Sequence, residues 1–398
     1  MDERGDGVTS LLYFVELPIL ISMSIPVIHE SGNGELVEKT KVLITGSLGY
    51  LGSMLTEYLA QHGCSCVGYD TGFFRDCLLY PPYPAQTVLR DARDITEQDL
   101  EGINAVVHLA GISNDPFGNL DAAAIYDPTR RYAKVLAEIC KRKGVRFVFA
   151  SSCSVYGKSD GGVLNEDSKA NPQTPYSLNK LQVEEDLRLL ADKDFSPIAL
   201  RFATAFGLSP RIRFDLVINM FAGMAAITKK IILNSDGNAW RPNVHVLDIC
   251  QAIRCAVASQ WHGGELLVLN VGDDANNMQI VEIAKLVQKS IPGCELKFLS
   301  EDKDLDKEGL VRDRKVKGTD TRTYQVSFEK IKKLFPDFRC EWTIEKGVRE
   351  MAEKFRELPL TEQSLKNINF YRLQKIERLY LDHCLSDDLR WIRPHDLT

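Results

Sequence analysis

Short apolar segments alternate with segments of helical character through the first half of the chain. The apolar runs predict buried strands, and they cover residues 42–44, 66–69, 105–109, 147–150 and 198–201. The intervening patterns predict helices over residues 51–59, 132–142 and 184–191. Strands that alternate with helices form parallel sheets joined by right-handed crossovers. The pattern therefore predicts an α/β fold of the Rossmann type, with a doubly wound parallel sheet.

The pattern changes after Gly207, where proline, arginine and aromatic residues become frequent and shorter elements interrupt one another. A chain of 398 residues is long enough for two lobes that share a cleft. We expect a sheet domain over 41–207 and a smaller, mixed α/β substrate-binding lobe over 208–357, with segments that return to the sheet. The polar tail 358–398 contains aromatic residues, so we expect helices packed on the body or on a partner subunit.

The N-terminal residues 1–40 are expected to form a poorly ordered or surface-docked extension. Residues 8–28 are largely apolar, but Glu16, Pro18 and Pro26 interrupt them. A membrane span needs about 20 apolar residues, and a charge within it is costly. No membrane span is therefore predicted. Association with a membrane and a true start at Met23 are the alternatives.

Charge and cysteine content narrow the classes of function. The net charge is −6 and the pI is about 5.8, whereas nucleic-acid binders are usually basic, so no nucleic-acid partner is expected. The 10 cysteines include no C-x-x-C pair and no cluster with histidine at zinc spacing, so no metal site is predicted. We expect reduced thiols and a cytoplasmic location.

A glycine-rich turn follows the first predicted strand and opens the first predicted helix. Gly46, Gly49 and Gly52 have the spacing G-x-x-G-x-x-G. In this context, the first glycine permits a tight turn, the second lets backbone N–H groups approach a pyrophosphate, and the third allows helix and strand to pack closely. The helix N-terminus favours the negative charge. The segment predicts a dinucleotide site.

Asp70 ends the second predicted strand, where a carboxylate can accept hydrogen bonds from the adenosine ribose. The same charge repels a 2′-phosphate, which favours NAD over NADP, although Arg75 nearby keeps NADP open. Asp91 and Ala92 follow the third strand region and could bracket the adenine edge. An ordinary acid in a turn is the alternative for Asp70.

Tyr176 and Lys180 are four residues apart on a predicted helix, which places both side chains on one face. A lysine ammonium close to a phenol favours the phenolate, a usable general base. Ser152 follows a predicted strand, where its hydroxyl could reach the same substrate oxygen. The three residues predict proton transfer at a hydroxyl group, and a surface pair on a helix is the alternative for the tyrosine and lysine.

With these motifs in order, the sequence resembles the extended short-chain dehydrogenase/reductase superfamily, and within it the NAD-dependent nucleotide-sugar epimerase/dehydratase family. The resemblance covers about residues 41–350. Its motifs are TGSLGYLG (45–52), Asp70, HLAG (108–111), SSCSVYG (151–157), YSLNK (176–180), RFATAFG (201–207) and RPNVHVLD (241–248).

The resemblance implies roles for individual residues. Tyr176 matches the base that removes a proton from a sugar hydroxyl, Lys180 the residue that holds the nicotinamide ribose, and Ser152 the residue that binds the reacting oxygen. The cofactor-binding positions that it implies are Gly46, Gly49, Tyr50, Leu51, Gly52, Asp70, Asp91, Ala92, Leu109, Ala110, Gly111, Tyr176 and Lys180. The implied substrate-binding positions are Ser113, Cys153, Thr204, Arg213, Asn219 and Arg241. A structural ion pair is the alternative for Arg241, which otherwise suits a nucleotide diphosphate.

Departures from the family's pattern bear on the reaction. Family 4,6-dehydratases usually have Asp-Glu after the active-site Ser/Thr, whereas this chain has Cys153 and Ser154. Cys153 could act as an acid or base in carbon-centred epimerisation, or it could be a small residue packed under the cofactor. Thr204 replaces a usual substrate-side Asn, and residues 127–131 (DPTRR) replace a usual Asn-x-x-Gly-Thr. Both departures argue against a plain UDP-galactose 4-epimerase.

Three functions remain open at this point. An epimerase of a nucleotide-activated sugar needs only oxidation, rotation of the keto intermediate and re-reduction, for which the residues suffice. A dehydratase or a reductase of a keto-sugar or alcohol on the same scaffold is the second possibility. A non-catalytic NAD-binding protein is the third, and the intact Ser152, Tyr176 and Lys180 set argues against it. The resemblance also implies a homodimer that packs through the helices starting near Tyr132 and carrying Tyr176.

Overall fold

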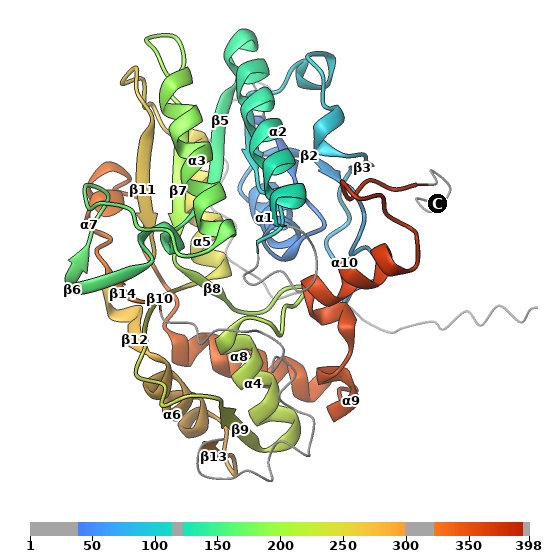
Figure 1. Ribbon diagram of the computed structural model, residues 1–398, viewed down its shortest axis with the longest axis vertical. Helices are drawn as coiled ribbons and strands as arrows, with labels where there is room; N and C mark the ends of the chain where they lie inside the picture. Colours follow the sequence, from blue (N-terminus) through green and yellow to red (C-terminus); the bar gives the residue numbers. More distant parts are fainter. Residues whose placement is uncertain (1–38, 114–121, 299–321, 393–398) are drawn as a thin grey trace, which may run out of the picture. The chain divides into compact units, whose positions relative to one another are not determined.

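A seven-stranded parallel sheet forms the centre of the computed structural model, which describes residues 39–113, 122–298 and 322–392 (Figure 1). The strand order is β11-β7-β5-β4-β1-β2-β3. The strands are β1 (Lys41–Thr45), β2 (Ser65–Asp70), β3 (Thr87–Leu89), β4 (Ala105–His108), β5 (Arg146–Ser152), β7 (Ile198–Phe202) and β11 (Leu267–Val271). The order reverses between β1 and β4, so their carboxyl ends border the crevice in which doubly wound sheets bind ligands. The predicted fold class is confirmed. The extension 1–40 lies almost wholly outside the described residues.

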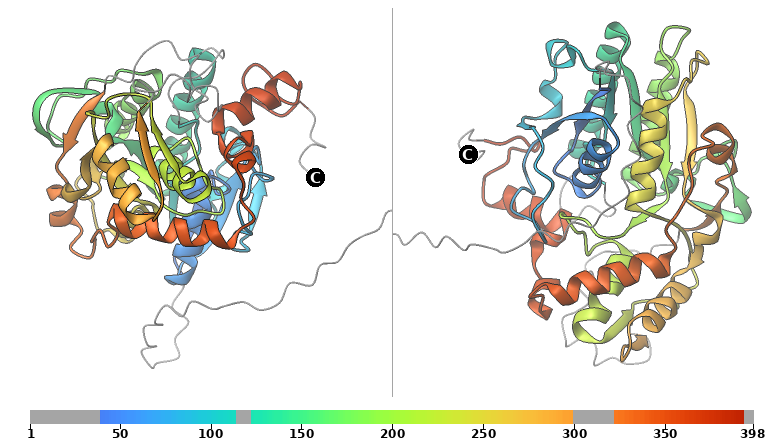
Figure 2. Two further views of the ribbon diagram at one scale, coloured as in Figure 1. Left: turned by 90° about the horizontal axis from the view of Figure 1, so that it is seen from below. Right: turned by 180° about the vertical axis from the view of Figure 1, so that it is seen from behind.

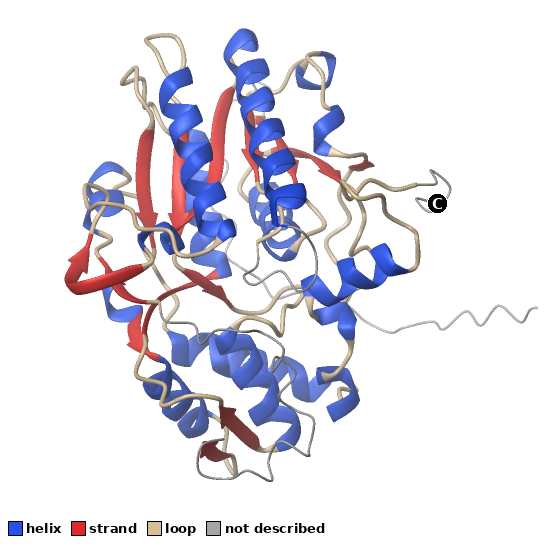
Figure 3. Ribbon diagram, viewed as in Figure 1, coloured by secondary structure: helices blue, strands red, loops and turns tan. Residues whose placement is uncertain are grey.

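Helices cover both faces of this sheet. Figure 1 shows α2 (Ala122–Lys143) and α3 (Pro175–Leu190) on one face, and the view from behind in Figure 2 shows α1 (Tyr50–Gln61) and α5 (Val246–Ala258) on the other. Secondary structure is coloured in Figure 3. Because both faces of the central strands are buried, β1 and β4 contain continuous apolar runs and not alternating apolar and polar residues.

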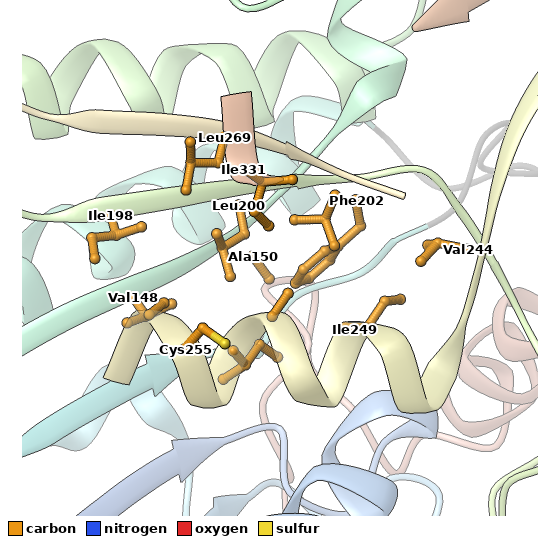
Figure 4. Close-up of a cluster of buried hydrophobic side chains, with 14 of the residues drawn as sticks. Val148, Ala150, Ile198, Leu200, Phe202, Val244, Ile249, Cys255, Leu269 and Ile331 are labelled. Carbon is orange, nitrogen blue, oxygen red and sulfur yellow. The ribbon is translucent and has the colours of Figure 1, made fainter. Parts of the chain in front are cut away.

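Alternate residues of β5 enter different cores. Val148, Leu200 and Leu269 belong to the core on the side of α5, and Figure 4 shows Val148 beside Cys255 of that helix. Phe147 faces the other way, into the core beneath α2 and α3. This alternation follows from strand geometry, in which successive side chains point to opposite faces.

The smaller lobe has a core of its own, built from α4, α6, α8 and one strand pair. These elements are α4 (Val217–Thr228), β9 (Lys230–Leu233), α6 (Ile280–Ser290), β13 (Glu295–Phe298) and α8 (Ile344–Glu357). There are two further small sheets in the described part of the chain. One contains β8 (Thr204–Phe206), β10 (Trp240–His245) and β12 (Asn277–Gln279), and the other pairs β6 (Lys158–Leu164) with β14 (Thr323–Val326). Although α5 and β11 come after residue 208, they belong to the layers of the main sheet.

Two helices begin earlier than the sequence pattern indicated. The second helix, α2, starts at Ala122 and contains Pro128, a residue that usually ends or kinks a helix. The third, α3, starts at Pro175, where Thr174 and Ser177 form a capping box. The apolar pattern alone begins both helices too late because it does not register capping or a tolerated proline, although the spacing of Tyr176 and Lys180 already predicted a helix at the start of α3.

The C-terminal tail contains α9 (Glu362–Leu365) and α10 (Arg372–Leu381), followed by a short bridge between Leu385 and Trp391. In the parts of the chain that the structure describes, no helix is long and apolar enough to cross a membrane. Nor do those parts bring together three or more histidine, cysteine or acidic side chains that could hold a metal ion.

Candidate active site

The glycine-rich loop leaves no room for side chains. Gly46 has a φ of +76°, and a Cβ added there would lie 2.9 Å from the backbone nitrogen of Ala110. A Cβ added to Gly52 would lie 2.1 Å from the carbonyl oxygen of Gly46. Gly49 is the N-cap of α1 and supplies no side-chain hydrogen bond. The first N–H groups of this helix are therefore oriented to bind an anion.

A pocket opens at the carboxyl ends of β1, β2 and β4, above this loop. It brings together most of the cofactor positions that the sequence suggested: Gly46, Gly49, Asp70, Asp91, Ala92, Leu109, Ala110 and Gly111. Tyr50, Leu51 and Gly52 continue from the loop into α1. The Tyr50 hydroxyl is engaged elsewhere, since it donates to the carbonyl oxygen of Gly207 at 2.8 Å.

Asp70 is held in place by the backbone around it. Its Oδ2 accepts from the N–H of Leu48 at 3.0 Å, and its Oδ1 accepts from the N–H of Gly72 at 2.8 Å. Burial raises the pKa of this carboxyl, and the two hydrogen bonds and the charges of Arg372 and Arg211 oppose that rise. The acid thus has a fixed position in the pocket wall, at the end of β2.

Tyr176 and Lys180 lie one turn apart on α3, beside the end of β5. The Lys180 Nζ lies 5.8 Å from the centre of the Tyr176 ring and donates to the carbonyl oxygen of Ala150 at 2.7 Å. Burial, reinforced by the positive charge of Arg372, lowers the pKa of Lys180 to about 7. Ser152 is the last residue of β5, and its hydroxyl accepts from the N–H of Ser154 at 3.2 Å. The structure therefore places the three predicted catalytic residues at the same end of the sheet.

A buried ion pair supports this arrangement from behind. The Glu184 carboxylate accepts from Arg201 at 2.6 Å and from the Ser151 hydroxyl, one residue before Ser152. Arg201 also donates to the Tyr156 hydroxyl at 2.9 Å, which in turn donates to the Asn270 side chain. The network joins α3, β5, β7 and β11, so it fixes the strand end that carries Ser152 relative to the helix that carries Tyr176.

The predicted substrate residues divide into two groups. Arg213 and Ser113 come together, because Arg213 Nη1 donates to the Ser113 hydroxyl at 3.2 Å while its other nitrogens pair with Asp215. Asn219 is 0% exposed, and its amide bonds the N–H of Gly207 at 3.0 Å and the carbonyl oxygen of Arg213 at 3.2 Å. Asn219 therefore holds the backbone of Arg213, and it is not among the residues that line the dinucleotide pocket.

Thr204 and Arg241 lie apart from the dinucleotide pocket. Thr204 is on β8, in register with Asn243 of β10. Arg241, also on β10, donates to the carbonyl oxygens of Trp240 and Arg322. These backbone contacts hold the guanidinium against β14, the strand that follows Arg322.

Cys153 is buried in the core beneath the sheet end. The residue is 1% exposed, and its thiol contacts the carbonyl oxygen of Arg201 at 3.2 Å. Burial raises the pKa of this thiol well above its usual range, whereas an acid–base cysteine needs a stabilised thiolate. The packing alternative agrees with this environment.

Several pocket residues were not identified from the sequence. Arg372, Ile376, Asp388 and Leu389 of the C-terminal tail line the same pocket as the glycine loop. So does Arg93, which pairs with Asp91 at 2.6 Å. The sequence signal for these tail residues was the aromatic content of the polar tail, which predicts that the tail packs on the protein but not where it packs.

The pocket residues suit a dinucleotide. The glycine cradle, which a Cβ would fill, leaves backbone N–H groups at a helix N-terminus for a pyrophosphate. Asp70, at the end of the neighbouring strand, is an acceptor for ribose hydroxyls. Loop, acid and helix thus occupy the relative positions that a dinucleotide requires.

Known proteins with related sequences act on nucleotide sugars. The UDP-glucose 4-epimerase of Azospirillum brasilense is 26% identical over 257 residues, which cover 58% of this chain and 72% of that protein. The dTDP-4-dehydro-6-deoxyglucose reductase of Escherichia coli is 25% identical over 276 residues, covering 64% and 84%.

A solved structure shares the fold. TunA, described as an NAD-dependent NDP-hexosamine 5,6-dehydratase of tunicamycin biosynthesis, superposes with a TM-score of 0.67 at 20% identity, covering 80% of this chain and 98% of its own. The sequence profile of the NAD dependent epimerase/dehydratase family matches residues 42–272, more than half of the chain. That span runs from the glycine loop through Tyr176 and Lys180 to the last strand of the sheet. The chain is therefore an enzyme of the NAD dependent epimerase/dehydratase family.

Proposed function

We propose that the enzyme epimerises a nucleotide-activated sugar. One observation carries the proposal: Tyr176, Lys180 and Ser152 lie at the end of β5, and the two positions directly after Ser152 hold no carboxylate. Tyr176 belongs to an apolar cluster with Phe73, Phe74 and Ile112, all of which line the dinucleotide pocket. The reacting hydroxyl would thus lie between the tyrosine and the dinucleotide.

Each of the three residues has a distinct task. NAD, when bound, supplies a reversible acceptor of hydride. Tyr176, as the phenolate, takes the proton of the sugar hydroxyl and later returns it. The Lys180 ammonium, 5.8 Å from the ring centre, stabilises the phenolate. Ser152 donates a hydrogen bond to the reacting oxygen. Inversion follows when the oxidised sugar turns its other face toward the same pocket.

The nucleotide carrier is assigned to arginines of the second lobe. Arg213 lies near enough to Tyr176 for their charges to interact, and it is oriented by Asp215 and Ser113. Its planar guanidinium suits a diphosphate. Arg241 is proposed as a second phosphate ligand and Thr204 as a sugar contact.

Dehydration and net reduction are the second candidate, because the related proteins include a keto-sugar reductase and the fold is shared with a dehydratase. Water elimination needs an additional acid near the sugar. The positions that usually supply it hold Cys153 and Ser154, both of them buried. We therefore rank epimerisation first.

The proposed assembly is a homodimer in the cytoplasm. Val135 of α2 and Leu178 and Leu189 of α3 are exposed large apolar side chains on adjacent helices, which supports packing against a second copy. The 10 unpaired cysteines support a reducing compartment. Light scattering of the wild type and of Leu178→Glu tests the dimer, which the charge should weaken.

The deciding experiment incubates the purified enzyme with UDP-, GDP-, CDP- and dTDP-sugars in deuterated water, followed by mass spectrometry and proton NMR. Conversion without a change of mass is expected. Loss of one water would replace the proposal by dehydration, and consumption of added NADH would replace it by reduction. Deuterium uptake without loss of water would indicate carbanion chemistry.

A further inference from the structure

The C-terminal tail forms part of the dinucleotide pocket. We use the term C-terminal strap for residues 372–391, which comprise α10 and the bridge after it. Arg372, Ile376, Asp388 and Leu389 of the strap line the pocket together with Gly46, Gly49 and Asp70. Figure 1 shows α10 close to β2 and β3, at the edge of the main sheet.

Polar contacts tie the strap to the sheet domain at several points. Trp391 Nε1 donates to the carbonyl oxygen of Thr71 at 2.7 Å, one residue beyond Asp70. Arg390 pairs with Asp94 at 2.9 Å. Arg93, which pairs with Asp91 in the pocket, also donates to the carbonyl oxygen of Asp388 at 2.8 Å. Lys375 pairs with Asp76 at 2.7 Å. These contacts are spread along the strap, so they hold it against the sheet domain over most of its length.

Arg372 extends from the strap over the glycine loop. A Cβ added to Gly49 would lie 3.8 Å from Arg372 Nη2. The other terminal nitrogen, Nη1, donates to the carbonyl oxygen of Gly111 at 3.3 Å and to the Ser113 hydroxyl. The guanidinium therefore lies between the N-terminus of α1 and the end of β4, where a dinucleotide pyrophosphate has to pass.

No carboxylate among the described residues forms an ion pair with Arg372, although Asp70 and Asp215 lie near enough for their charges to act on it. Its Nε is buried and makes no hydrogen bond in that part of the chain. Arg211 is 1% exposed and likewise has two buried nitrogens, Nε and Nη2, without a partner there. Burial and the repulsion of Arg213 and Arg211 lower the pKa of Arg372 to about 9. Buried cations are normally paired, so an anion is the missing component.

We propose that Arg372 binds the pyrophosphate of NAD, and that the C-terminal strap covers the adenosine half so that the cofactor stays bound between turnovers. A guanidinium and a helix N-terminus would hold the same phosphates from opposite sides. The inference depends on the family's cofactor and not on the proposed sugar reaction. A failure of the epimerase proposal would leave it untouched.

The phosphate role is tested with Arg372→Met, and Arg378→Met is the matched control. Arg378 is on the same helix, but its side chain is 64% exposed and pairs only with Asp382 among the described carboxylates. Purified protein is assayed for bound NAD, and nucleotide-free protein is titrated calorimetrically with NAD, ADP-ribose and adenosine. Arg372→Met should lower the affinity for NAD and for ADP-ribose by about 10- to 100-fold, because a hydrogen bond between charged groups is lost. Adenosine binding should not change, and Arg378→Met should match the wild type.

Three results would overturn the phosphate role. Unchanged ADP-ribose affinity would exclude the contact. An equal loss of affinity for adenosine and for ADP-ribose would mean that Arg372 only supports the fold of the pocket. In a parallel titration with UDP, weaker UDP binding together with unchanged ADP-ribose binding would assign the guanidinium to the sugar nucleotide instead.

Retention by the strap is tested through Trp391→Leu, which removes the bond to Thr71 and the edge contact with Phe73. Release of bound NAD into excess competing ADP-ribose should accelerate about 10-fold or more relative to the wild type and to Arg378→Met. An unchanged release rate would show that the strap does not retain the cofactor, whatever Arg372 binds.

Discussion

The buried pair between Glu184 and Arg201 allows a quantitative test of how the active site is supported. The Glu184 side chain is 0% exposed and that of Arg201 is 5% exposed. Glu184→Gln keeps the shape of the side chain but leaves the guanidinium in the interior without its counter-charge. Removing one partner of a buried pair typically costs about 3–5 kcal/mol, a large part of the ~5–15 kcal/mol that stabilises a typical protein.

The measurement is equilibrium urea unfolding of nucleotide-free protein, followed by fluorescence and circular dichroism. Ser151→Ala removes one hydrogen bond to the carboxylate and should cost less, about 1.5–3 kcal/mol, as for other bonds to charged groups. It remains informative if Glu184→Gln does not fold. Glu345→Gln, at an exposed pair with Arg349, is the control and should match the wild type within error.

Loss of less than about 1 kcal/mol in Glu184→Gln would refute the reasoning, since the pair would then not be desolvated as its burial implies. The variant should also lose activity beyond its loss of folded protein. Glu184 is one turn beyond Lys180 on α3, and its partner Ser151 precedes Ser152. Activity per folded molecule equal to the wild type would show that the ion pair does not position the catalytic residues.

Three further outcomes follow from the site. Gly46→Ala should destabilise the protein by about 1–3 kcal/mol in urea unfolding, because of its positive φ and the close backbone of Ala110; unchanged stability would contradict the loop geometry. Burial lowers the pKa of His108 to about 3, so the wild type should lose stability relative to His108→Gln as the pH falls from 6.5 toward 3, because the unfolded chain binds the proton first; parallel pH curves would exclude this. Tyr176→Phe should retain NAD, measured by its release on denaturation, yet lose at least about 100-fold in kcat; near-normal turnover would remove Tyr176 from catalysis.

The sequence predicted those parts of the molecule that depend on local patterns. Strands such as β4 and β5 are buried on both faces, so their apolar runs are continuous and easily recognised. The loop at Gly46 was predicted because backbone sterics alone demand glycine there. Tyr176 and Lys180 were paired by helical spacing. In each case the determining contacts lie within a few residues of sequence or within a repeating element.

The surroundings of the site could not be predicted in the same way. The helix α2 includes Pro128, so a prediction from the local sequence pattern begins this helix after the proline and therefore too late. Asn219 is a predicted substrate residue, and nothing in the sequence indicated that its amide bonds to Gly207 and Arg213, contacts that only the folded chain creates. For Cys153 the sequence left acid–base chemistry and packing open, and the burial of the side chain, which only the fold reveals, agrees with packing.

The C-terminal strap is the furthest from local prediction, and the reason is physical. Arg372 and Gly111 are 261 residues apart in sequence, yet they share a hydrogen bond at the pocket. No periodicity encodes such a contact, because it exists only after the sheet has formed and supplied the acceptor. The strap in turn places the buried Arg372 guanidinium beside the positive N-terminal end of a helix. The two repel each other until an anion binds between them. Closure of the strap and binding of the dinucleotide should therefore stabilise each other, so that strap variants lower cofactor affinity and cofactor removal loosens the strap by the same free energy.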